Sequence, residues 1–226
     1  MAEPQELKIA VNDAESVTAL LYPAAKSNRS GVTLLLGHGA GADQLSGFMR
    51  MAANGFAARG FDAMTFNFLY KEKGKSVPDP KPKLESCYRA VIDAALKHKK
   101  LKDNRLVIGG KSMGGRIASQ VAEAEGERVG GLVFLGYPLH PPGRPEKMRD
   151  DHLPGIKAPM LFVQGARDAF GTEAEIEAII KKHRLPATLY VIESGDHSFK
   201  VPKSVKPQPQ VYEDVMDEVA RWCSEL

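Results

Sequence analysis

The amino-acid sequence has few cysteines, one tryptophan and no apolar run long enough to cross a bilayer. Its two cysteines, Cys87 and Cys223, lack the spacing of metal ligands and fall on apolar faces of expected helices. We therefore expect buried, reduced thiols, and neither a disulfide framework nor a metal site. The segment 1–7 also lacks the apolar core of a signal peptide, so we predict a cytoplasmic location.

The chain also lacks an excess of charge of one sign. It contains 31 lysines and arginines and 28 aspartates and glutamates, which gives a formal net charge of +3 spread along the sequence. Such a balance gives little support for a nucleic-acid or membrane partner. The one dense basic run, 97–102, ends an expected helix, where cations interact favourably with the helix dipole. We predict neither a nucleic-acid partner nor a membrane partner.

What the sequence does have is a regular alternation of short extended runs and helical periodicities. With 226 residues, 43% of them hydrophobic, it can bury one large core, and it shows no internal repeat and no linker. We predict a single domain over 1–226, of the α/β class, with a mostly parallel central sheet flanked by helices on both faces. The expected strands cover residues 17–22, 32–36, 63–66, 106–108, 129–135, 160–163 and 188–192.

One serine stands at a sharp strand-to-helix turn. Ser112 lies in the run Gly110-Lys111-Ser112-Met113-Gly114, directly after an expected strand and directly before a helical periodicity. This arrangement is typical of a nucleophile elbow. Glycines two residues to either side are needed because the serine adopts a strained backbone conformation and a Cβ there would collide with a neighbouring element.

A serine hydroxyl becomes a strong nucleophile only when a histidine takes its proton and a carboxylate orients that histidine. Asp168 follows the expected strand 160–163, and His197 follows the expected strand 188–192. The order Ser, Asp, His and the place of each residue after its own strand fit a hydrolase triad. We predict Ser112, Asp168 and His197 as the catalytic residues.

Each member of this triad also has a less specific interpretation. A lone Gly-x-Ser-x-Gly match arises by chance, and an isolated loop histidine is commonly incidental. Among other acids, Asp196 adjoins the base, and Asp150 and Asp151 precede a strand instead of following one. Glu173 is better explained by an expected helix that starts with a capping box at 172–175. The combination of three residue types in the right order favours the triad.

The tetrahedral intermediate of acyl transfer needs hydrogen-bond donors for its oxyanion. We predict the backbone N–H groups of Met113 and Ala40, the second in the loop 37–41 that follows an expected strand. Small residues there, Gly39 and Gly41, let the backbone approach a substrate, and they are candidate pocket residues together with two side chains, Tyr70 and His140. We expect His38, in the same loop, to hold the loop by hydrogen bonds and not to act as a second base.

Two nucleotide-binding motifs are matched only in part by the sequence. Gly110-Lys111-Ser112 imitates the end of a phosphate-binding loop, but that pattern requires a glycine where this chain has Arg105. Gly37-x-Gly39-x-x-Ala42 imitates a dinucleotide fingerprint, yet the next strand ends in Asn67 and Phe68, where an acidic residue would bind the ribose. The sequence therefore implies no nucleotide, and acyl transfer by a triad requires no metal or organic cofactor.

Several stretches resemble a known family more specifically. They are His38-Gly39-Ala40-Gly41, Phe66-Asn67-Phe68-Leu69-Tyr70, Gly110 to Arg116, Gly136 to Gly143, Arg149-Asp150-Asp151-His152-Leu153, Gln164 to Asp168 and Gly195-Asp196-His197. These motifs resemble the α/β-hydrolase-like family of testis-expressed protein 30, which includes regulatory subunit 3 of the nonspecific-lethal histone acetyltransferase complex and is more distantly similar to dienelactone hydrolases. The resemblance implies the α/β-hydrolase fold and supports the same triad, but it implies no particular substrate.

The leading hypothesis is a serine hydrolase that cleaves a carboxylic ester or thioester through an acyl-enzyme. The segment 138–159, where many hydrolases insert a lid, is too short for a substantial one, which favours an open site and small acyl substrates. A peptidase or a dienelactone-type hydrolase is an alternative. So is a non-catalytic protein-interaction module, since the resembling family includes a subunit of a chromatin complex. Nothing else in the sequence indicates a protein partner.

Overall fold

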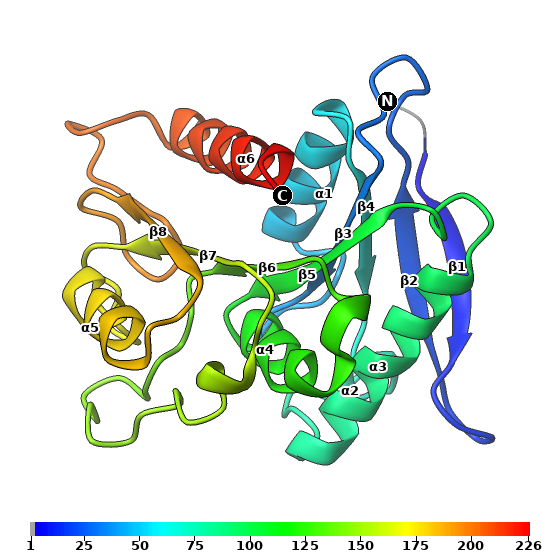
Figure 1. The fold of residues 1–226 in the computed structure, drawn as a ribbon, viewed down its shortest axis with the longest axis horizontal. Helices are drawn as coiled ribbons and strands as arrows, with labels where there is room; N and C mark the ends of the chain where they lie inside the picture. The colour runs from blue at the N-terminus through cyan, green and yellow to red at the C-terminus, as the bar shows by residue number, and fades with distance from the viewer. Residues whose placement is uncertain (1–2) are drawn as a thin grey trace.

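The computed structural model describes residues 3–226. Residues 1 and 2 lie outside the described residues. They belong to the segment 1–7, from which a cytoplasmic location was predicted, and to the predicted domain 1–226. Its centre is an eight-stranded sheet with the order β1-β2-β4-β3-β5-β6-β7-β8 (Figure 1). Strand β2 runs antiparallel to its two neighbours, and the remaining pairs from β4 to β8 are parallel. The strands are β1 (Gln5–Ala10), β2 (Ser16–Tyr22), β3 (Val32–Gly37), β4 (Asp62–Phe66), β5 (Arg105–Lys111), β6 (Gly131–Leu135), β7 (Met160–Gly165) and β8 (Ala187–Ile192).

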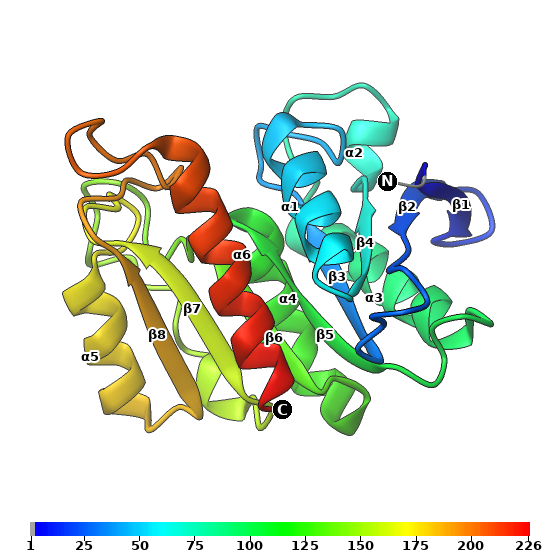
Figure 2. The same ribbon diagram turned by 90° about the horizontal axis from the view of Figure 1, so that it is seen from above.

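Helices cover both faces of the sheet, as Figures 1 and 2 show. Helices α1 and α6 lie against one face, and α3, α4 and α5 lie against the other. A short helix, α2, follows β4. The helices are α1 (Gly47–Ala58), α2 (Leu69–Glu72), α3 (Lys81–Lys97), α4 (Met113–Glu125), α5 (Glu173–His183) and α6 (Gln208–Ser224). The prediction of a mostly parallel sheet between two helical layers is confirmed.

The sheet separates two hydrophobic cores. Phe56 of α1 and Trp222 of α6 pack in one core, whereas Ile117 of α4 and Ile176 of α5 pack in the other. All six residues of β3 are buried, because a parallel strand covered on both faces has no side that points to water. Cys87 and Cys223 are buried on α3 and α6 as predicted, unbonded, and burial raises the pKa of each thiol to about 12.

The sequence missed one strand and misplaced several boundaries. Strand β1 was not predicted because it is an edge strand with mostly exposed residues, of which only Ile9 is buried. Helix α3 begins at Lys81; Pro82 is compatible with a helical first turn, where its missing N–H is not needed. Strand β6 begins at Gly131, two residues later than predicted.

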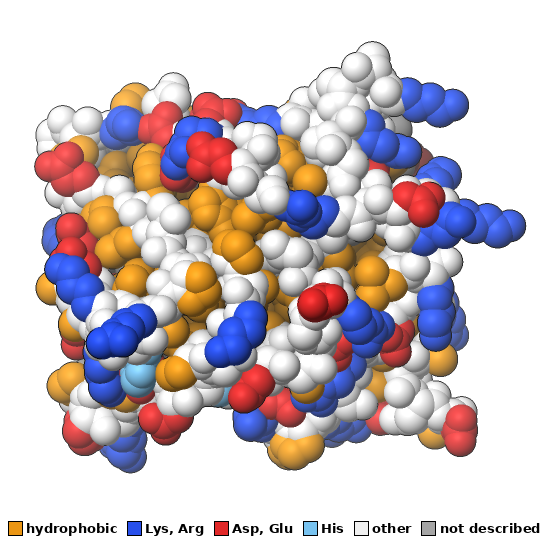
Figure 3. Space-filling view, viewed as in Figure 1, with side chains coloured by type: hydrophobic (Ala, Val, Ile, Leu, Met, Phe, Trp, Pro, Cys, Tyr) orange, Lys and Arg blue, Asp and Glu red, His pale blue; other side chains and the backbone are white. Residues whose placement is uncertain are grey.

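The segment between β6 and β7 carries no lid domain. Its only helical turn is a single 3₁₀ turn, Leu153–Gly155, among the described residues. No helix within residues 3–226 combines the length and the apolar character needed to cross a bilayer. On the face drawn in Figure 3, acidic and basic side chains are interspersed around an apolar centre, and neither sign dominates.

Candidate active site

The topology brings two loops together at the carboxyl edge of the sheet. Strand β3 pairs with β4 on one side and with β5 on the other, so the chain leaves β3 and β5 in different directions. Crevices at such a switch point are where α/β sheets bind ligands. The loop 37–41 follows β3 and Ser112 follows β5, which places the predicted oxyanion loop beside the predicted nucleophile.

The backbone of Ser112 has the strained conformation expected of a nucleophile elbow, with φ 50° and ψ −114°. The turn fits only because glycines flank it. A Cβ added at Gly110 or at Gly114 would lie 2.1 Å from the carbonyl oxygen of Gly37. The elbow therefore packs directly against the end of β3.

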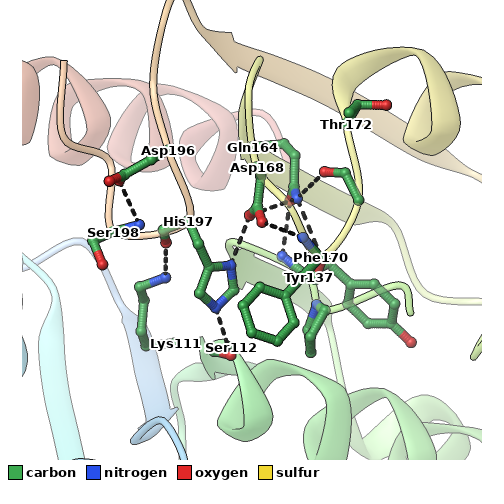
Figure 4. A network of polar contacts seen from close by, with 12 residues as sticks. Lys111, Ser112, Tyr137, Gln164, Asp168, Phe170, Thr172, Asp196, His197 and Ser198 are labelled. Atoms are coloured by element: carbon green, nitrogen blue, oxygen red, sulfur yellow. Dashed lines mark hydrogen bonds and ion pairs between the residues drawn. The ribbon is translucent and has the colours of Figure 1, made fainter. Parts of the chain in front are cut away.

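The structure brings Ser112, His197 and Asp168 into one chain of hydrogen bonds (Figure 4). His197 Nδ1 lies 2.7 Å from Asp168 Oδ2, and His197 Nε2 lies 2.8 Å from Ser112 Oγ. A neutral imidazole carries one N–H, and the carboxylate can only accept. The proton therefore lies on Nδ1, and Nε2 faces the serine hydroxyl as an acceptor. This is the tautomer that a general base requires.

Asp168 is fully buried and its carboxylate is held from several sides. The backbone N–H of Phe170 donates to Oδ1 at 2.8 Å, and the Gln164 amide donates to Oδ2 at 2.9 Å. Gln164 is itself fixed, since its amide also donates to the Gly171 carbonyl and its oxygen accepts from the Tyr137 N–H. Gln164 was quoted in the sequence motif without a role; a buried polar residue next to the end of β7 is the signal that could have found it.

An aromatic ring packs beside the imidazole. The rings of Phe170 and His197 lie 4.2 Å apart between centroids with a tilt of 33°. The His197 side chain keeps 22% of its surface exposed, whereas the carboxylate behind it is inaccessible to solvent. The histidine thus faces a partly open site on the serine side. Phe170 was not predicted, and nothing in its sequence pattern distinguishes it from a core residue.

A second serine–histidine contact involves Ser119 of α4, and in it the histidine donates the hydrogen bond instead of accepting it. Ser119 Oγ lies 2.7 Å from His152 Nε2, but this hydroxyl also donates to the Arg116 carbonyl at 2.7 Å. Its single proton is therefore engaged, and His152 must donate to Ser119 and cannot act as its base. Ser119 is also fully buried inside α4, so it is not accessible to a substrate.

The loop 37–41 contributes the second candidate oxyanion donor. The backbone N–H groups of Ala40 and Met113 have no hydrogen-bond acceptor within residues 3–226, and the second stands in the first turn of α4. A Cβ at the buried Gly39 would lie 3.8 Å from Ser112 Cβ, so this glycine lies next to the nucleophile. Gly41 is exposed, and a Cβ there would meet no atom within 4 Å.

His38 holds this loop, as predicted. Its Nε2 accepts the Phe68 N–H at 3.2 Å, which leaves Nδ1 to donate to the Gly39 carbonyl at 2.8 Å. Burial lowers the pKa of His38 to about 4, so the ring is neutral near pH 7. A buried neutral histidine with both nitrogens engaged stabilises the loop and has no nitrogen left for a substrate.

Two candidate pocket side chains have other contacts. Tyr70 is fully buried and its hydroxyl donates to the Ala40 carbonyl at 2.8 Å, so it supports the oxyanion loop from behind. His140 is also buried, with one ring nitrogen 2.9 Å from the Pro141 carbonyl and the other 3.2 Å from Glu175. Both side chains are buried and hydrogen-bonded within the protein, and their assignment as pocket residues stays a prediction. A local motif shows that a polar residue lies near a strand end but not which way it points.

Comparisons with known proteins identify the family and the fold of this chain. A model of the family described as alpha/beta hydrolase domain matches residues 30–225. That range includes the loop after β3, the elbow and all three predicted triad residues.

Solved structures of similar shape span almost the whole chain. An α/β serine hydrolase without lid from Xanthomonas campestris has a TM-score of 0.76 at 18% identity, covering 98% of this chain and 96% of that chain. Dienelactone hydrolase from Anabaena variabilis has a TM-score of 0.74 at 21% identity, covering 99% and 97%. Est1E from Butyrivibrio proteoclasticus, solved with ferulic acid, has a TM-score of 0.73 at 17% identity, covering 95% and 99%. At these identities the likeness establishes the fold.

Proposed function

The chain belongs to the alpha/beta hydrolase domain family, and from that premise we propose that it is a serine hydrolase that cleaves a carboxylic ester or thioester through an acyl-enzyme. The observation that carries the proposal is the hydrogen-bond chain Ser112–His197–Asp168 at a strained elbow, with the imidazole in the tautomer of a general base. The contrast with Ser119 and His152 shows that proximity of a serine to a histidine is not sufficient.

In the first half-reaction, His197 Nε2 takes the proton of Ser112 Oγ as this oxygen attacks the acyl carbon. The resulting imidazolium is stabilised by Asp168, and the oxyanion accepts hydrogen bonds from the Ala40 and Met113 amides. The imidazolium then donates its proton to the leaving alcohol or thiol. In the second half-reaction, His197 activates a water, which attacks the acyl-enzyme and releases the acid and the free serine.

The open architecture supports small or partly soluble acyl substrates. No lid domain stands over the carboxyl edge of the sheet in residues 3–226, and a partly exposed His197 is consistent with direct access. Among proteins of similar shape, one is a dienelactone hydrolase and another binds ferulic acid, both of which point to small organic acids or their esters. A dienelactone-type or peptidase activity would use the same machinery with a different leaving group.

We further propose that the chain belongs, within its family, to the group of testis-expressed protein 30. The supporting features are the sequence motifs around the elbow and after β6.

A cytoplasmic location and the absence of nucleic-acid and membrane partners remain predictions from the sequence, to be checked by cell fractionation and by a nucleic-acid binding assay.

A fluorophosphonate probe tests the nucleophile directly, because Ser112 Oγ attacks phosphorus and fluoride leaves. We expect stoichiometric labelling of the wild type and none of Ser112→Ala. Ser119→Ala is the matched control and should be labelled, since its hydroxyl proton is engaged by a carbonyl. Asp168→Asn should lower kcat for a short p-nitrophenyl ester by on the order of 10³- to 10⁴-fold, because the wrong tautomer is favoured.

Equal labelling of the wild type and Ser112→Ala would contradict the proposal that Ser112 is the nucleophile. Absence of both labelling and ester turnover in the folded wild type, with a stoichiometric protein partner retained by Ser112→Ala, would instead favour a non-catalytic interaction module.

A further inference from the structure

A lysine lies beside the nucleophile and the base. Lys111 is the last residue of β5 and immediately precedes Ser112. Its ammonium donates a hydrogen bond to the backbone carbonyl of His197, which Figure 4 shows beside the triad. One residue is therefore joined to the serine through the backbone and to the histidine through its side chain.

The surroundings of the ammonium form a closely fitting site. Lys111 Nζ lies 4.7 Å from the ring centroid of Phe199 and 6.0 Å from that of Phe48. Gly136, at the end of β6, leaves the remaining space: a Cβ there would lie 2.8 Å from Nζ and 3.2 Å from the His197 carbonyl oxygen. Aromatic faces attract a cation, and the absent side chain admits it.

The turn that carries His197 is also held by hydrogen bonds within it and by donors from Arg167 and Gln208. Asp196 Oδ1 accepts the N–H groups of Ser198 and Lys200, and Phe199 N–H donates to the Asp196 carbonyl. These bonds shape the turn but do not attach it to the elbow. The bond from Lys111 spans 86 positions in the sequence and joins the two.

The charge on Lys111 has no close counter-ion. Within residues 3–226 it makes no ion pair, and Asp168 and Asp196 act on it only at longer range. Burial lowers the pKa of Lys111 to about 8, against the opposing effect of these two carboxylates. A largely buried cation without a counter-ion destabilises a fold, so its presence beside the triad calls for a functional reason.

We propose that Lys111 is a positioning residue that holds the His197 turn against the nucleophile elbow. This inference rests on the proposed serine-hydrolase function. The charge-assisted bond keeps His197 Nε2 within hydrogen-bond distance of Ser112 Oγ while the histidine gains and loses its proton. Because the bond ends on a backbone carbonyl, it constrains the position of the imidazole without competing for its nitrogens.

Three variants test the role. Lys111→Met keeps the aliphatic volume and removes the donor, Lys111→Arg keeps the charge and the donors, and Lys100→Met removes an exposed lysine as the control. We expect Lys111→Met to lower kcat and the rate of fluorophosphonate labelling by about tenfold to 100-fold with little change in KM, the scale of loss for a misplaced catalytic group. Lys111→Arg should retain more activity, and Lys100→Met should match the wild type.

The pH profile supplies a readout that needs no substitution. Wild-type kcat should decline above about pH 8, as the ammonium loses its proton and the charge-assisted bond weakens. This decline should shift to higher pH in Lys111→Arg, because a guanidinium stays charged. The downfield NMR resonance of the His197 Nδ1 proton should shift or broaden in Lys111→Met and stay unchanged in Lys100→Met.

The proposal is overturned if folded Lys111→Met has the same kcat as the wild type and an unshifted His197 resonance. The resonance reports the position of the histidine even if the wild type neither hydrolyses esters nor reacts with the probe. Failure of the proposed function is therefore distinguishable from failure of this inference.

Discussion

At the scale of single residues, close approach and proton position decide what the site can do. Gly110 and Gly114 let the elbow pack against the Gly37 carbonyl at the end of β3, because neither carries a Cβ. The hydrogen-bond partners of each histidine, and not its proximity to a serine, decide which one can accept a proton. Both properties depend on individual atoms, and both lead to measurable predictions.

The glycine at 114 should be irreplaceable for steric reasons alone. In Gly114→Ala the new Cβ would lie 2.1 Å from the Gly37 carbonyl oxygen, so backbone must move. We expect the free energy of unfolding to fall by about 1–3 kcal/mol, as for overpacked cores, when measured by urea denaturation. Gly41→Ala is the control and should change it by less than about 0.5 kcal/mol, because that Cβ meets no atom. Equal losses in the two variants would contradict the packing argument.

His38 should make stability depend on pH in the acidic range. Its folded-state pKa is about 4, below the ordinary value near 6.5, so the unfolded chain binds the proton first. The free energy of unfolding should therefore fall as pH decreases from 6.5 to 4, by at most about 3 kcal/mol. His38→Gln can keep both hydrogen bonds but does not titrate. The free energy of unfolding of this variant relative to that of the wild type should therefore rise as pH decreases from 6.5 to 4. A constant difference between the two proteins from pH 7 to pH 4 would refute this.

At the scale of elements, helix α5 is connected to the active-site edge by its first turn. The predicted capping box is confirmed: Thr172 accepts the Glu175 N–H, and the Glu175 carboxylate accepts the Thr172 N–H at 2.8 Å. The other carboxylate oxygen of Glu175 contacts His140, on the segment after β6. One glutamate thus begins a helix and fixes the side chain of His140 in the loop after β6.

Thr172→Ala should therefore lower the free energy of unfolding by about 1 kcal/mol, the usual cost of removing an N-cap. Thr172→Ser keeps the hydroxyl and should lose much less. Chemical denaturation of the three proteins measures the difference. If the serine variant is as unstable as the alanine variant, then methyl packing and not the cap accounts for the effect.

At the scale of the whole molecule, the open carboxyl edge distinguishes this chain from hydrolases with a mobile cover. The segment between β6 and β7 contains only one 3₁₀ turn among the described residues, and the serine is reached from an edge formed by several loops. Binding should therefore require no large rearrangement of the chain.

Hydrolysis should accordingly show no interfacial activation. The rate with a short-chain p-nitrophenyl ester should follow a simple saturation curve and show no jump where the substrate begins to form micelles. Initial rates measured across the solubility limit give the test, with Ser112→Ala as the blank. An abrupt rise at that limit would show that part of the structure moves on contact with an interface.

The sequence by itself determined the fold class, most strands, the capping box and the three residues placed after their strands. These features depend on local patterns: periodicity, glycine spacing and the order of chemical groups along the chain. It could not determine that Tyr70 hydrogen-bonds the Ala40 carbonyl, that Gln164 fixes Asp168, or that His140 contacts Glu175.

Only the tertiary structure decided those contacts, because they depend on sheet register and on the direction in which each side chain leaves its element. The bond from Lys111 to the His197 carbonyl joins residues 86 positions apart. One is the last residue of β5 and the other follows β8, and β6 and β7 lie between these two strands in the assembled sheet. Local pattern specifies what chemistry a residue can perform; the packing of distant segments specifies which atoms it meets.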